Sequence, residues 1–519
     1  MTTITDGHNA KTGTDGAARD GATMPLASLL RRALGTDAPV PKDVRITDIC
    51  SDSRKAAPGA LFVALPGTKA DGATFIADAL GRGAAAVVCE QRATVPAGAT
   101  AIRVADARVA LAKLAAVFCG LDRLQSEGEL TAVGITGTNG KSTTAFMVRA
   151  ILRASGRSAG LLGTIEYDLV GRKLGADLTT PDCVTLTRHL VEAHRAGARH
   201  VVMEVSSHSL DQRRTDGVVF NTAVFTNLTQ DHLDYHGTLD NYLLAKRRLF
   251  DVLAADDSAL VNADDPASAR LIEHCKARVR RYGLAADADI RAEILAEDIS
   301  GTRFALHEGG RSFEIRTPHI GRHNVYNSLA AAAVGLALGI EPEAIQRGLG
   351  GLRHVPGRLQ RVPTDGLGFD IFVDYAHTDD ALKNVLGAVR PVTRGRLWCV
   401  FGCGGDRDRT KRPKMARATA ECADHFVVTS DNPRTEDPLA IIREIETGLT
   451  AADRSRGRTE PDRAAAIGWA IDQLAPGDTL VIAGKGHEDY QILGTTKIHF
   501  DDAEVAAAAV ERRRNGGRA

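Results

Sequence analysis

Short apolar runs alternate with stretches rich in alanine and leucine along almost the entire chain. The short runs have the length of buried β-strands, and the Ala/Leu-rich stretches have the composition of helices. Strands that alternate with helices are typical of layered α/β folds in which many strands run parallel. The hydrophobic pattern therefore predicts an α/β protein.

The chain length indicates several domains, because 519 residues are too many for one hydrophobic core. We place an N-terminal domain at residues 24–108, a central domain at 109–354 and a C-terminal domain at 355–519, which starts at a Val-Pro-Gly turn. Residues 284–319 look antiparallel or irregular. The strand-like runs are 60–65, 84–89 and 101–104 in the first domain, 131–133, 200–205 and 222–227 in the second, and 371–374, 397–401, 425–429 and 479–483 in the third.

Composition excludes several kinds of partner. Lys plus Arg and Asp plus Glu both number 65, so no net charge attracts nucleic acid or an anionic membrane. The longest apolar runs are interrupted by glycine and are too short to span a bilayer.

Residues 1–23 are rich in Gly, Ala, Thr and Asp, which predicts a disordered tail and not a signal peptide. The eight cysteines are scattered without a CxxC pair, which favours reduced thiols in a cytoplasmic protein.

The segment GITGTNGKST at 134–143 follows an apolar run and precedes a helix-like stretch at 144–155. Glycines let backbone N–H groups close around phosphate oxygens, and the helix N-terminus adds positive potential. The pattern predicts that Lys141 contacts the β- and γ-phosphates of a nucleotide and that the Ser142 hydroxyl binds Mg²⁺. Ile135 occupies the first glycine position of the strict pattern, so a chance turn is the alternative. The predicted nucleotide-binding residues are Gly137, Thr138, Asn139, Gly140, Lys141, Ser142 and Thr143.

Ionisable residues follow the next strand-like runs. Glu204 ends one run, where a carboxylate beside a phosphate loop can bind Mg²⁺, but a helix cap or a salt bridge is an equal alternative. The segment 228–236 concentrates ionisable residues, and His232 is the better ligand candidate because it lies nearest the strand end. A solvated turn is the alternative there. Lys246 lies in the helix-like stretch 240–253, where a lone lysine is usually exposed.

Segments spread over the chain after residue 50 resemble the Mur ligases, the ATP-dependent enzymes that add amino acids to the muramyl peptide precursor of the bacterial cell wall. The resemblance implies three domains: an N-terminal UDP-binding α/β domain, a central P-loop ATPase-like domain with a parallel sheet, and a C-terminal Rossmann-like domain that binds the amino acid. The matching segments are GTNGKS (137–142), MEVSSH (203–208), NLTQDH (227–232), YLLAK (242–246), GRHNVYN (321–327), VPGR (355–358), VDYAHT (373–378), GCGGDRD (402–408) and GKGHE (484–488).

By this resemblance, Lys141, Glu204, His232 and Lys246 form the catalytic set. Ser142 and Glu204 would hold one Mg²⁺ between the ATP phosphates, and a second Mg²⁺ is expected near His232 and Lys246. The matching lysine of the family is carbamylated by CO₂. A carbamate offers two anionic oxygens to Mg²⁺, whereas an ammonium would repel the ion. An unmodified Lys246 in a solvent-facing salt bridge is the alternative.

The segment DNPR at 431–434 resembles the form of the family that adds meso-2,6-diaminopimelate to UDP-N-acetylmuramoyl-L-alanyl-D-glutamate. Diaminopimelate carries a second carboxylate, and an arginine fork binds carboxylate through two hydrogen bonds. Lysine has no such carboxylate, so it would leave Arg434 without a partner. The implied reaction forms an acyl phosphate on the D-glutamate side chain, which the amine then attacks to give an amide. His208 is a candidate general base, with a structural role as the alternative.

The resemblance also assigns residues to each substrate. For ATP it adds Asn324 and Asn327, although helix capping explains both asparagines equally well. For the UDP-muramyl dipeptide the residues are Ser51, Ser53, Thr68, Lys69, Ala70, Thr179, Thr180, Ser206, Gln212 and Arg214. For diaminopimelate they are Arg407, Asp431, Asn432, Pro433, Arg434, Gly484 and Glu488.

Three other functions compete with this interpretation. The ligase that adds D-alanyl-D-alanine and folylpolyglutamate synthase share the phosphate loop, but both are disfavoured by the segment 431–434. A nucleotide switch that merely binds ATP would need neither the second metal site nor three substrate domains. The expected partners are therefore ATP, the UDP-muramyl dipeptide and diaminopimelate, with no nucleic acid and no membrane span, and the protein is expected to be monomeric.

Overall fold

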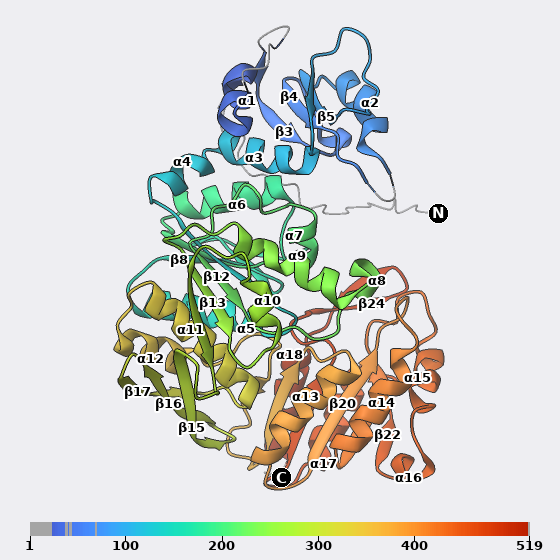
Figure 1. Cartoon of the computed structure of the whole chain (residues 1–519). Coiled ribbons are helices and arrows are strands. Elements are labelled where there is room, and N and C mark those ends of the chain that lie inside the picture. Colours follow the sequence, from blue (N-terminus) through green and yellow to red (C-terminus); the bar gives the residue numbers. More distant parts are fainter. Residues whose placement is uncertain (1–22, 37–39, 41–43, 68–69, 517–519) are drawn as a thin grey trace, which may run out of the picture. The chain divides into compact units, whose positions relative to one another are not determined.

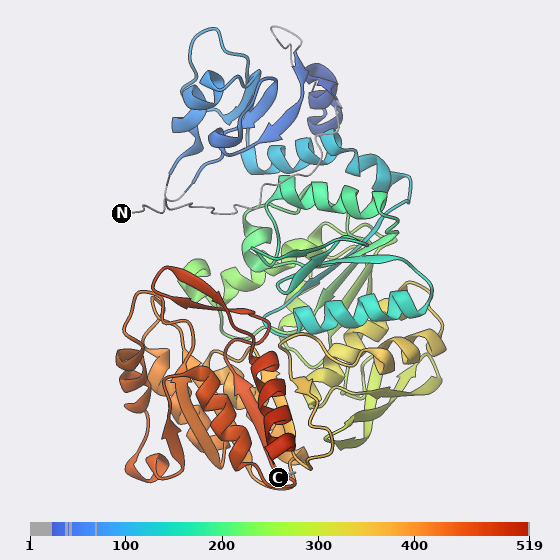
Figure 2. The ribbon, with the colours of Figure 1, turned by 180° about the vertical axis from the view of Figure 1, so that it is seen from behind.

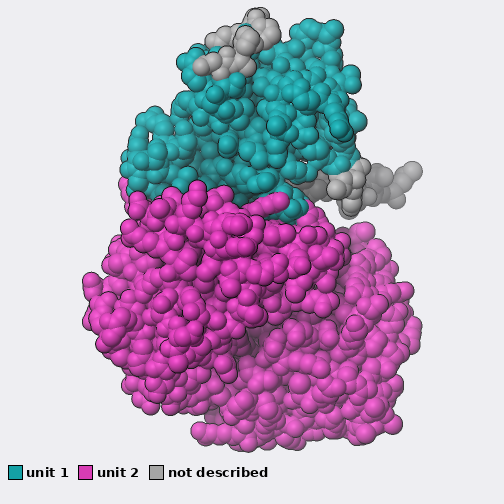
Figure 3. Space-filling model, in the orientation of Figure 1, with its two compact units in different colours: residues 1–130, 181–196, 208–219 teal, residues 131–180, 197–207, 220–519 magenta. Residues whose placement is uncertain are grey.

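The computed structural model describes residues 23–36, 40, 44–67 and 70–516, so almost all of the predicted tail lies outside the described residues. The chain separates into two compact units (Figure 3). Unit 1 contains residues up to 130 together with 181–196 and 208–219, and unit 2 contains the rest. The predicted domain boundaries at 108 and 354 stay predictions.

Unit 1 is built on a parallel sheet in the order β3 (Asp48–Cys50), β4 (Ala60–Val63), β5 (Ala86–Glu90) and β6 (Ala101–Val104). Side chains alternate between the two faces of these strands. One face packs on α1 (Leu26–Leu34) and α3 (Ala107–Cys119), and the other packs on α2 (Ile76–Gly81). The strands predicted at 60–65, 84–89 and 101–104 are therefore present.

The central sheet of unit 2 places three strand ends at one edge. Strand β7 (Thr131–Thr136) lies between β11 (His200–Glu204) and β12 (Thr222–Phe225), and all three run parallel. Helices α5 (Lys141–Ala154), α11 (Arg322–Ala337) and α12 (Pro342–Gly351) bury an apolar cluster against the sheet (Figure 1). Because parallel strands end at the same edge, the loops that follow β7, β11 and β12 meet there.

The same sheet continues on the other side through β13 (Ser258–Asn262) and β14 (Arg278–Gly283) into β15 (Ile290–Asp298), β16 (Gly301–Glu308) and β17 (Arg311–Thr317). The last three strands pair antiparallel. These strands lie within residues 284–319, which the sequence predicted to be antiparallel or irregular. The structure shows that they are antiparallel.

The C-terminal sheet is a second parallel layer, in the order β18 (Gln360–Val362), β19 (Asp370–Asp374), β23 (Thr479–Ala483), β20 (Leu397–Cys403), β21 (His425–Ser430) and β22 (Gly457–Thr459), with only β18 antiparallel among these. Helices α13 (Asp379–Val389), α14 (Lys411–Cys422) and α15 (Pro438–Glu446) cover one face (Figure 1). Helices α17 (Arg463–Gln473) and α18 (Asp502–Gly516) cover the other, seen from behind in Figure 2.

The predicted start of one helix is wrong by three residues. Helix α5 begins at Lys141, not at Thr144. Gly140 has φ 85°, and this left-handed conformation ends the loop and starts the helix at once. Lys141 and Ser142 therefore belong to the first helical turn. Among the helices that the structure describes, none combines the length and apolar character needed to cross a membrane.

Candidate functional site

The phosphate loop is pinned to the end of the neighbouring strand. The backbone N–H of Thr138 donates to the carbonyl of Asn227 at 2.8 Å, and that of Asn139 donates to Asn227 Oδ1 at 3.0 Å. A Cβ on Gly137 would lie 1.9 Å from Thr226 Oγ1, and one on Gly140 would lie 2.4 Å from an amide oxygen of α11. Both positions therefore require glycine, because the loop passes too close to its neighbours for any side chain.

Lys141 folds back over its own loop. Its Nζ donates to the carbonyls of Gly137 at 2.9 Å and Thr138 at 2.8 Å. Burial lowers the pKa of this amine, while the nearby Glu204 and Asp231 act in the opposite direction. A half-buried cation held only by neutral carbonyls is suited to bind an anion such as a phosphate.

Two oxygen ligands meet beside the loop. Ser142 Oγ donates to Glu204 Oε2 at 3.0 Å, and the Glu204 side chain is buried, with a relative exposure of 1%. The backbone N–H of Thr164 donates to Glu204 Oε1 at 2.8 Å and so fixes the orientation of the carboxylate. A hydroxyl and a carboxylate in contact fit Mg²⁺, which binds through one or two carboxylates together with substrate phosphates.

The sequence reasoning missed two residues that support this carboxylate, Gly163 and Thr164. A Cβ on Gly163 would lie 2.3 Å from Glu204 Oε1. The only signal in the sequence was a Gly-Thr pair after the apolar run that forms β8 (Ala159–Leu162). Such a pair is too common to identify a site without the contact to Glu204.

Replacing Gly163 by alanine is expected to weaken Mg²⁺-dependent ATP binding about tenfold, because the added methyl group displaces the Glu204 carboxylate. Titration calorimetry with a non-hydrolysable ATP analogue, with and without Mg²⁺, measures the effect. Gly175→Ala is the matched control, since a Cβ on Gly175 in β10 (Lys173–Gly175) meets nothing within 4 Å. Equal affinities for the Gly163 variant and the wild type would contradict the prediction.

Lys246 lies in α9 (Leu239–Asp251) and is buried, with a relative exposure of 1%. Its Nζ donates to the Gly137 carbonyl at 2.9 Å and lies 4.2 Å from the centre of the Tyr242 ring. Among the described residues Lys246 forms no ion pair, so the alternative of a solvent-facing salt bridge is wrong. Burial lowers the pKa of the amine well below its ordinary value, and the charge of Lys141 acts in the same direction.

His232 starts the short helix α8 (Leu233–His236) with φ 54°, a left-handed conformation. Its Nε2 lies 3.6 Å from Asp231 Oδ2, and burial lowers the pKa of the imidazole, aided by the charges of Lys141 and Lys246. His236 is buried instead and shares a hydrogen bond of 2.9 Å with Ser207 Oγ. Within the described chain, no three His, Cys, Asp or Glu side chains cluster as a metal site on their own.

The two asparagines of α11 contact each other and the loop. Asn327 Nδ2 donates to Asn324 Oδ1 at 3.0 Å, and Asn324 Nδ2 donates to the Ile320 carbonyl at 2.8 Å. The Asn327 amide oxygen also accepts from Thr144 Oγ1 at 3.4 Å, next to Gly140. The structure therefore brings Asn327 to the phosphate loop, while Asn324 binds the chain just before the start of its own helix.

The residues predicted to bind the UDP-muramyl dipeptide fall in both units. In unit 2, Thr180 Oγ1 donates to the Glu204 carbonyl at 2.8 Å and accepts from the Ser206 N–H at 3.1 Å, and Thr179 Oγ1 lies 2.9 Å from Thr164 Oγ1. These three residues therefore surround the Glu204 strand end.

In unit 1, Ser53 is buried at the start of a short 3₁₀ turn, and Asp52 accepts from the Arg54 N–H at 3.0 Å. Gln212 Oε1 accepts from Arg214 Nη2 at 2.6 Å, so these two predicted residues are in direct contact. Ser51 and Ala70 lie in loops of the same unit, and the predicted Thr68 and Lys69 lie outside the described residues.

Most residues predicted to bind diaminopimelate gather at the ends of β21 and β23. Asn432 Nδ2 donates to Glu488 Oε2 at 2.8 Å. Lys485, which the sequence reasoning did not assign, is fully buried, and its Nζ lies 3.2 Å from Asn432 Oδ1, 3.5 Å from Asp431 Oδ1 and 3.7 Å from Glu488 Oε2. Burial raises the pKa of Glu488, with the nearby Asp431 as the next cause. Gly484 has φ 117°, and a Cβ there would lie 3.3 Å from Asp431 Oδ2.

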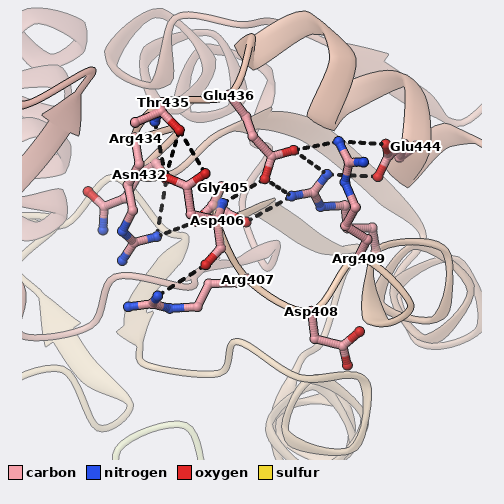
Figure 4. A network of polar contacts seen from close by, with 12 residues as sticks. Gly405, Asp406, Arg407, Asp408, Arg409, Asn432, Arg434, Thr435, Glu436 and Glu444 are labelled. Atoms are coloured by element: carbon pink, nitrogen blue, oxygen red, sulfur yellow. Dashed lines mark hydrogen bonds and ion pairs between the residues drawn. The ribbon is translucent and has the colours of Figure 1, made fainter. Parts of the chain in front are cut away.

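The two predicted arginines reach only backbone carbonyls. Arg434 Nη1 donates to the Gly405 carbonyl at 2.8 Å, and Arg407 Nη1 donates to the Asp406 carbonyl at 3.1 Å (Figure 4). Neither guanidinium forms an ion pair with a carboxylate of the described chain. Pro433, the remaining predicted residue, lies between Asn432 and Arg434. Two guanidinium groups at one sheet edge without ion-pair partners are suited to bind a ligand that carries carboxylates.

Known protein families match the chain over most of its length. The profile of the "Mur ligase family, catalytic domain" matches residues 45–119, that of the "Mur ligase middle domain" matches 135–335, and that of the "Mur ligase, glutamate ligase domain" matches 357–486. The first match falls in unit 1, and the third covers the sheet that carries the two arginines.

Individual relatives extend the match to nearly whole chains. UDP-N-acetylmuramoyl-L-alanyl-D-glutamate--2,6-diaminopimelate ligase of Solibacter usitatus is 46% identical over 471 residues, covering 90% of this chain and 94% of the relative. The protein of the same name from Geobacter sulfurreducens is 46% identical over 491 residues, covering 91% and 96%. A solved structure of a UDP-N-acetylmuramoyl-L-alanyl-D-glutamate--2,6-diaminopimelate ligase aligns with a TM-score of 0.71 and 32% identity, over 95% of this chain and 100% of that chain.

Proposed function

This chain belongs to the Mur ligase family, and we propose that it catalyses the ATP-dependent addition of meso-2,6-diaminopimelate to UDP-N-acetylmuramoyl-L-alanyl-D-glutamate in peptidoglycan precursor synthesis. The observation that carries the proposal is the similarity to ligases of that name over 90% of the chain. The two guanidinium groups at the end of the C-terminal sheet agree with it, because diaminopimelate carries two carboxylates, one in each amino-acid head.

The reaction has two steps. An oxygen of the D-glutamate side-chain carboxylate attacks the γ-phosphorus of ATP, so that an acyl phosphate forms and ADP leaves. The neutral amine of diaminopimelate then attacks the acyl carbon, the nitrogen loses a proton to water as the amide bond forms, and phosphate leaves with the oxygen that joined it to the carbon. The chain contributes mainly by positioning the reactants and by neutralising charge. Lys141 does so at the γ-phosphate, once the phosphate replaces the two loop carbonyls that its Nζ now contacts.

Magnesium is part of this proposal. Ser142 and Glu204 would hold one ion, since their oxygens already lie 3.0 Å apart beside the phosphate loop. Bound Mg²⁺ would neutralise charge on the β- and γ-phosphates as the phosphoryl group transfers. The backbone N–H of Thr164 keeps the Glu204 carboxylate facing this position before any ligand arrives.

We also propose that Lys246 is carbamylated and that its carbamate, with His232, provides a second Mg²⁺ site. Carbamylation requires a neutral amine, because the nitrogen lone pair attacks CO₂ and the nitrogen then loses a proton. Burial favours that neutral form by lowering the pKa of Lys246. The low pKa of His232 similarly favours the neutral imidazole that a metal needs.

The substrate contacts proposed from the sequence remain part of the proposal. Arg407 and Arg434 would bind carboxylates of diaminopimelate, and Glu488 would bind its distal ammonium group. Lys485 stabilises the ionised form of Glu488 by its charge, which opposes the effect of burial. A cytoplasmic, monomeric enzyme is also proposed, and the scattered cysteines without a CxxC pair support the cytoplasm.

An assay with alternative amine substrates tests this function. The protein is incubated with ATP, Mg²⁺ and UDP-N-acetylmuramoyl-L-alanyl-D-glutamate, and phosphate release is measured with diaminopimelate, L-lysine or D-alanyl-D-alanine. We expect release only with diaminopimelate, together with a product whose mass equals that of the two substrates minus one water. Release with lysine but not with diaminopimelate would overturn the proposed substrate, and absence of release with every amine would overturn the proposed reaction.

A further inference from the structure

Two loops carry the two arginines at the end of the C-terminal sheet (Figure 4). The loop 404–410 follows β20 and contains Arg407, and the loop 431–437 follows β21 and contains Arg434. The loops touch through backbone groups as well as side chains. The Gly405 N–H donates to the Asn432 carbonyl at 2.9 Å, and a Cβ on Gly405 would lie 1.9 Å from the Pro433 carbonyl oxygen.

Side chains join the two loops at Thr435 and Glu436. Thr435 Oγ1 lies 2.8 Å from Asp406 Oδ1 and 3.0 Å from Asp406 Oδ2, and the Thr435 N–H donates to the same carboxylate at 3.2 Å. In the reverse direction, the Asp406 N–H donates to Glu436 Oε1 at 2.6 Å. Asp406, which immediately precedes Arg407, is therefore bound to Thr435 and Glu436, the two residues that follow Arg434.

Glu436 is itself fixed from the helix side. The guanidinium of Arg412, which has no exposed surface, donates to both oxygens of Glu436 at 2.8 and 3.0 Å and to Glu444 of α15 at 2.7 Å. Arg409 donates to Glu436 at 2.8 Å. These contacts lower the pKa of Glu436 to about 2, with the Arg412 hydrogen bond as the largest cause and the Asp406 N–H as the next. Glu436 is therefore a charged acceptor at neutral pH, and four hydrogen bonds hold its carboxylate.

The backbone of both loops is held in an unfavourable conformation. Asp406 has φ 53° and Arg434 has φ 52°, in the left-handed backbone region that residues other than glycine rarely adopt. Such conformations persist only where surrounding contacts enforce them. The contacts made by Thr435 and Glu436 act on Asp406 and on the chain beside Arg434. Within the described part of the chain, neither side chain forms a hydrogen bond or ion pair with the phosphate loop.

We propose that Thr435 and Glu436 are positioning residues that set the spacing of Arg407 and Arg434, and so select an amino acid with two carboxylates. The inference rests on the proposed function, because it assumes that both arginines bind diaminopimelate. Misplacing a binding group by about 1 Å can reduce activity a hundredfold. The hydrogen bonds of Thr435 and Glu436 fix the positions of the two arginines. They therefore control the affinity for diaminopimelate, although neither Thr435 nor Glu436 contacts the substrate.

Substitution of Thr435 tests this role. Thr435→Val keeps the shape and the backbone N–H but removes the hydroxyl donor to Asp406. We expect KM for diaminopimelate to rise about tenfold, with KM for ATP and for the UDP-muramyl dipeptide unchanged. Thr435→Ser retains the hydroxyl and should restore KM to near the wild-type value.

Thr450→Val is the matched control. Thr450 starts the short helix α16 (Ala451–Arg454), and its hydroxyl lies 2.6 Å from Asp453 Oδ2, so the variant also removes a hydroxyl contact to a carboxylate in the same domain. It should leave every KM unchanged. Asp406→Asn provides a second route, because asparagine tolerates the left-handed conformation but carries no charge, and KM for diaminopimelate should rise again.

The outcomes separate this inference from the proposed function. If the wild type ligates diaminopimelate but both Thr435→Val and Asp406→Asn keep its KM, the positioning role is wrong. The same holds if KM for ATP rises as much as KM for diaminopimelate, since that pattern indicates general loss of structure. If the wild type does not use diaminopimelate at all, the proposed function fails instead.

Discussion

Replacement of Lys246 by alanine is expected to reduce the rate of ligation by about a thousandfold, and added bicarbonate should not restore it. The amine lies buried beside the phosphate loop, where its Nζ donates to the Gly137 carbonyl at 2.9 Å and meets no carboxylate of the described chain. An unmodified lysine there would add a third positive centre beside Lys141 and the proposed magnesium ion. A carbamate reverses that charge and supplies oxygen ligands for a cation, and the alanine side chain has no amine on which a carbamate could form.

Three measurements separate the chemical role of Lys246 from a packing role. Labelled bicarbonate should give a carbamate resonance in the wild type that is absent from Lys246→Ala. Thermal denaturation of Lys246→Met, which keeps most of the apolar side chain, should show a folded protein that is equally inactive. Lys383→Ala serves as the control, because Lys383 is half-exposed on α13 and pairs with Glu421 at 3.0 Å. A fully active Lys246→Ala enzyme would refute the second metal site.

Arg434→Ala should raise KM for diaminopimelate about a hundredfold, since the variant leaves a substrate carboxylate without its guanidinium partner. Arg434→Lys keeps the positive charge but cannot form two parallel hydrogen bonds to a carboxylate, so KM for diaminopimelate is expected to rise about tenfold. Neither change should alter KM for ATP. Removal of the arginine should also weaken discrimination against lysine, because a guanidinium without a carboxylate partner is what rejects that substrate.

Steady-state kinetics with diaminopimelate and with lysine measure both effects. Arg443→Lys is the matched control, since Arg443 lies exposed on α15 in the same domain and, among the described residues, forms an ion pair only with Asp437 at 3.4 Å. It should behave as the wild type with either amine. An Arg434→Lys enzyme with unchanged KM for diaminopimelate would show that the guanidinium fork does not bind the substrate.

Local sequence determined the elements of this protein well. The runs at 200–205 and 222–227 became β11 and β12, and the glycine-rich segment at 134–143 joined β7 to α5. Side-chain periodicity, glycine conformation and helix propensity act within a few residues, so they can be read without a structure. The start of α5 was the exception, because the left-handed Gly140 lets the helix begin inside the loop motif.

The sequence by itself therefore determined the α/β class, the phosphate loop and the candidate residues at the ends of strands. Only the tertiary structure decided that Lys246 is buried instead of exposed, that Gly163 and Thr164 orient Glu204, and that Thr435 and Glu436 join the two arginine loops. The physical reason is that each of these contacts joins residues about 30 to 110 positions apart, and nothing in either short segment specifies its partner. Burial, close approach and loop spacing arise only when the sheets bring those distant segments together.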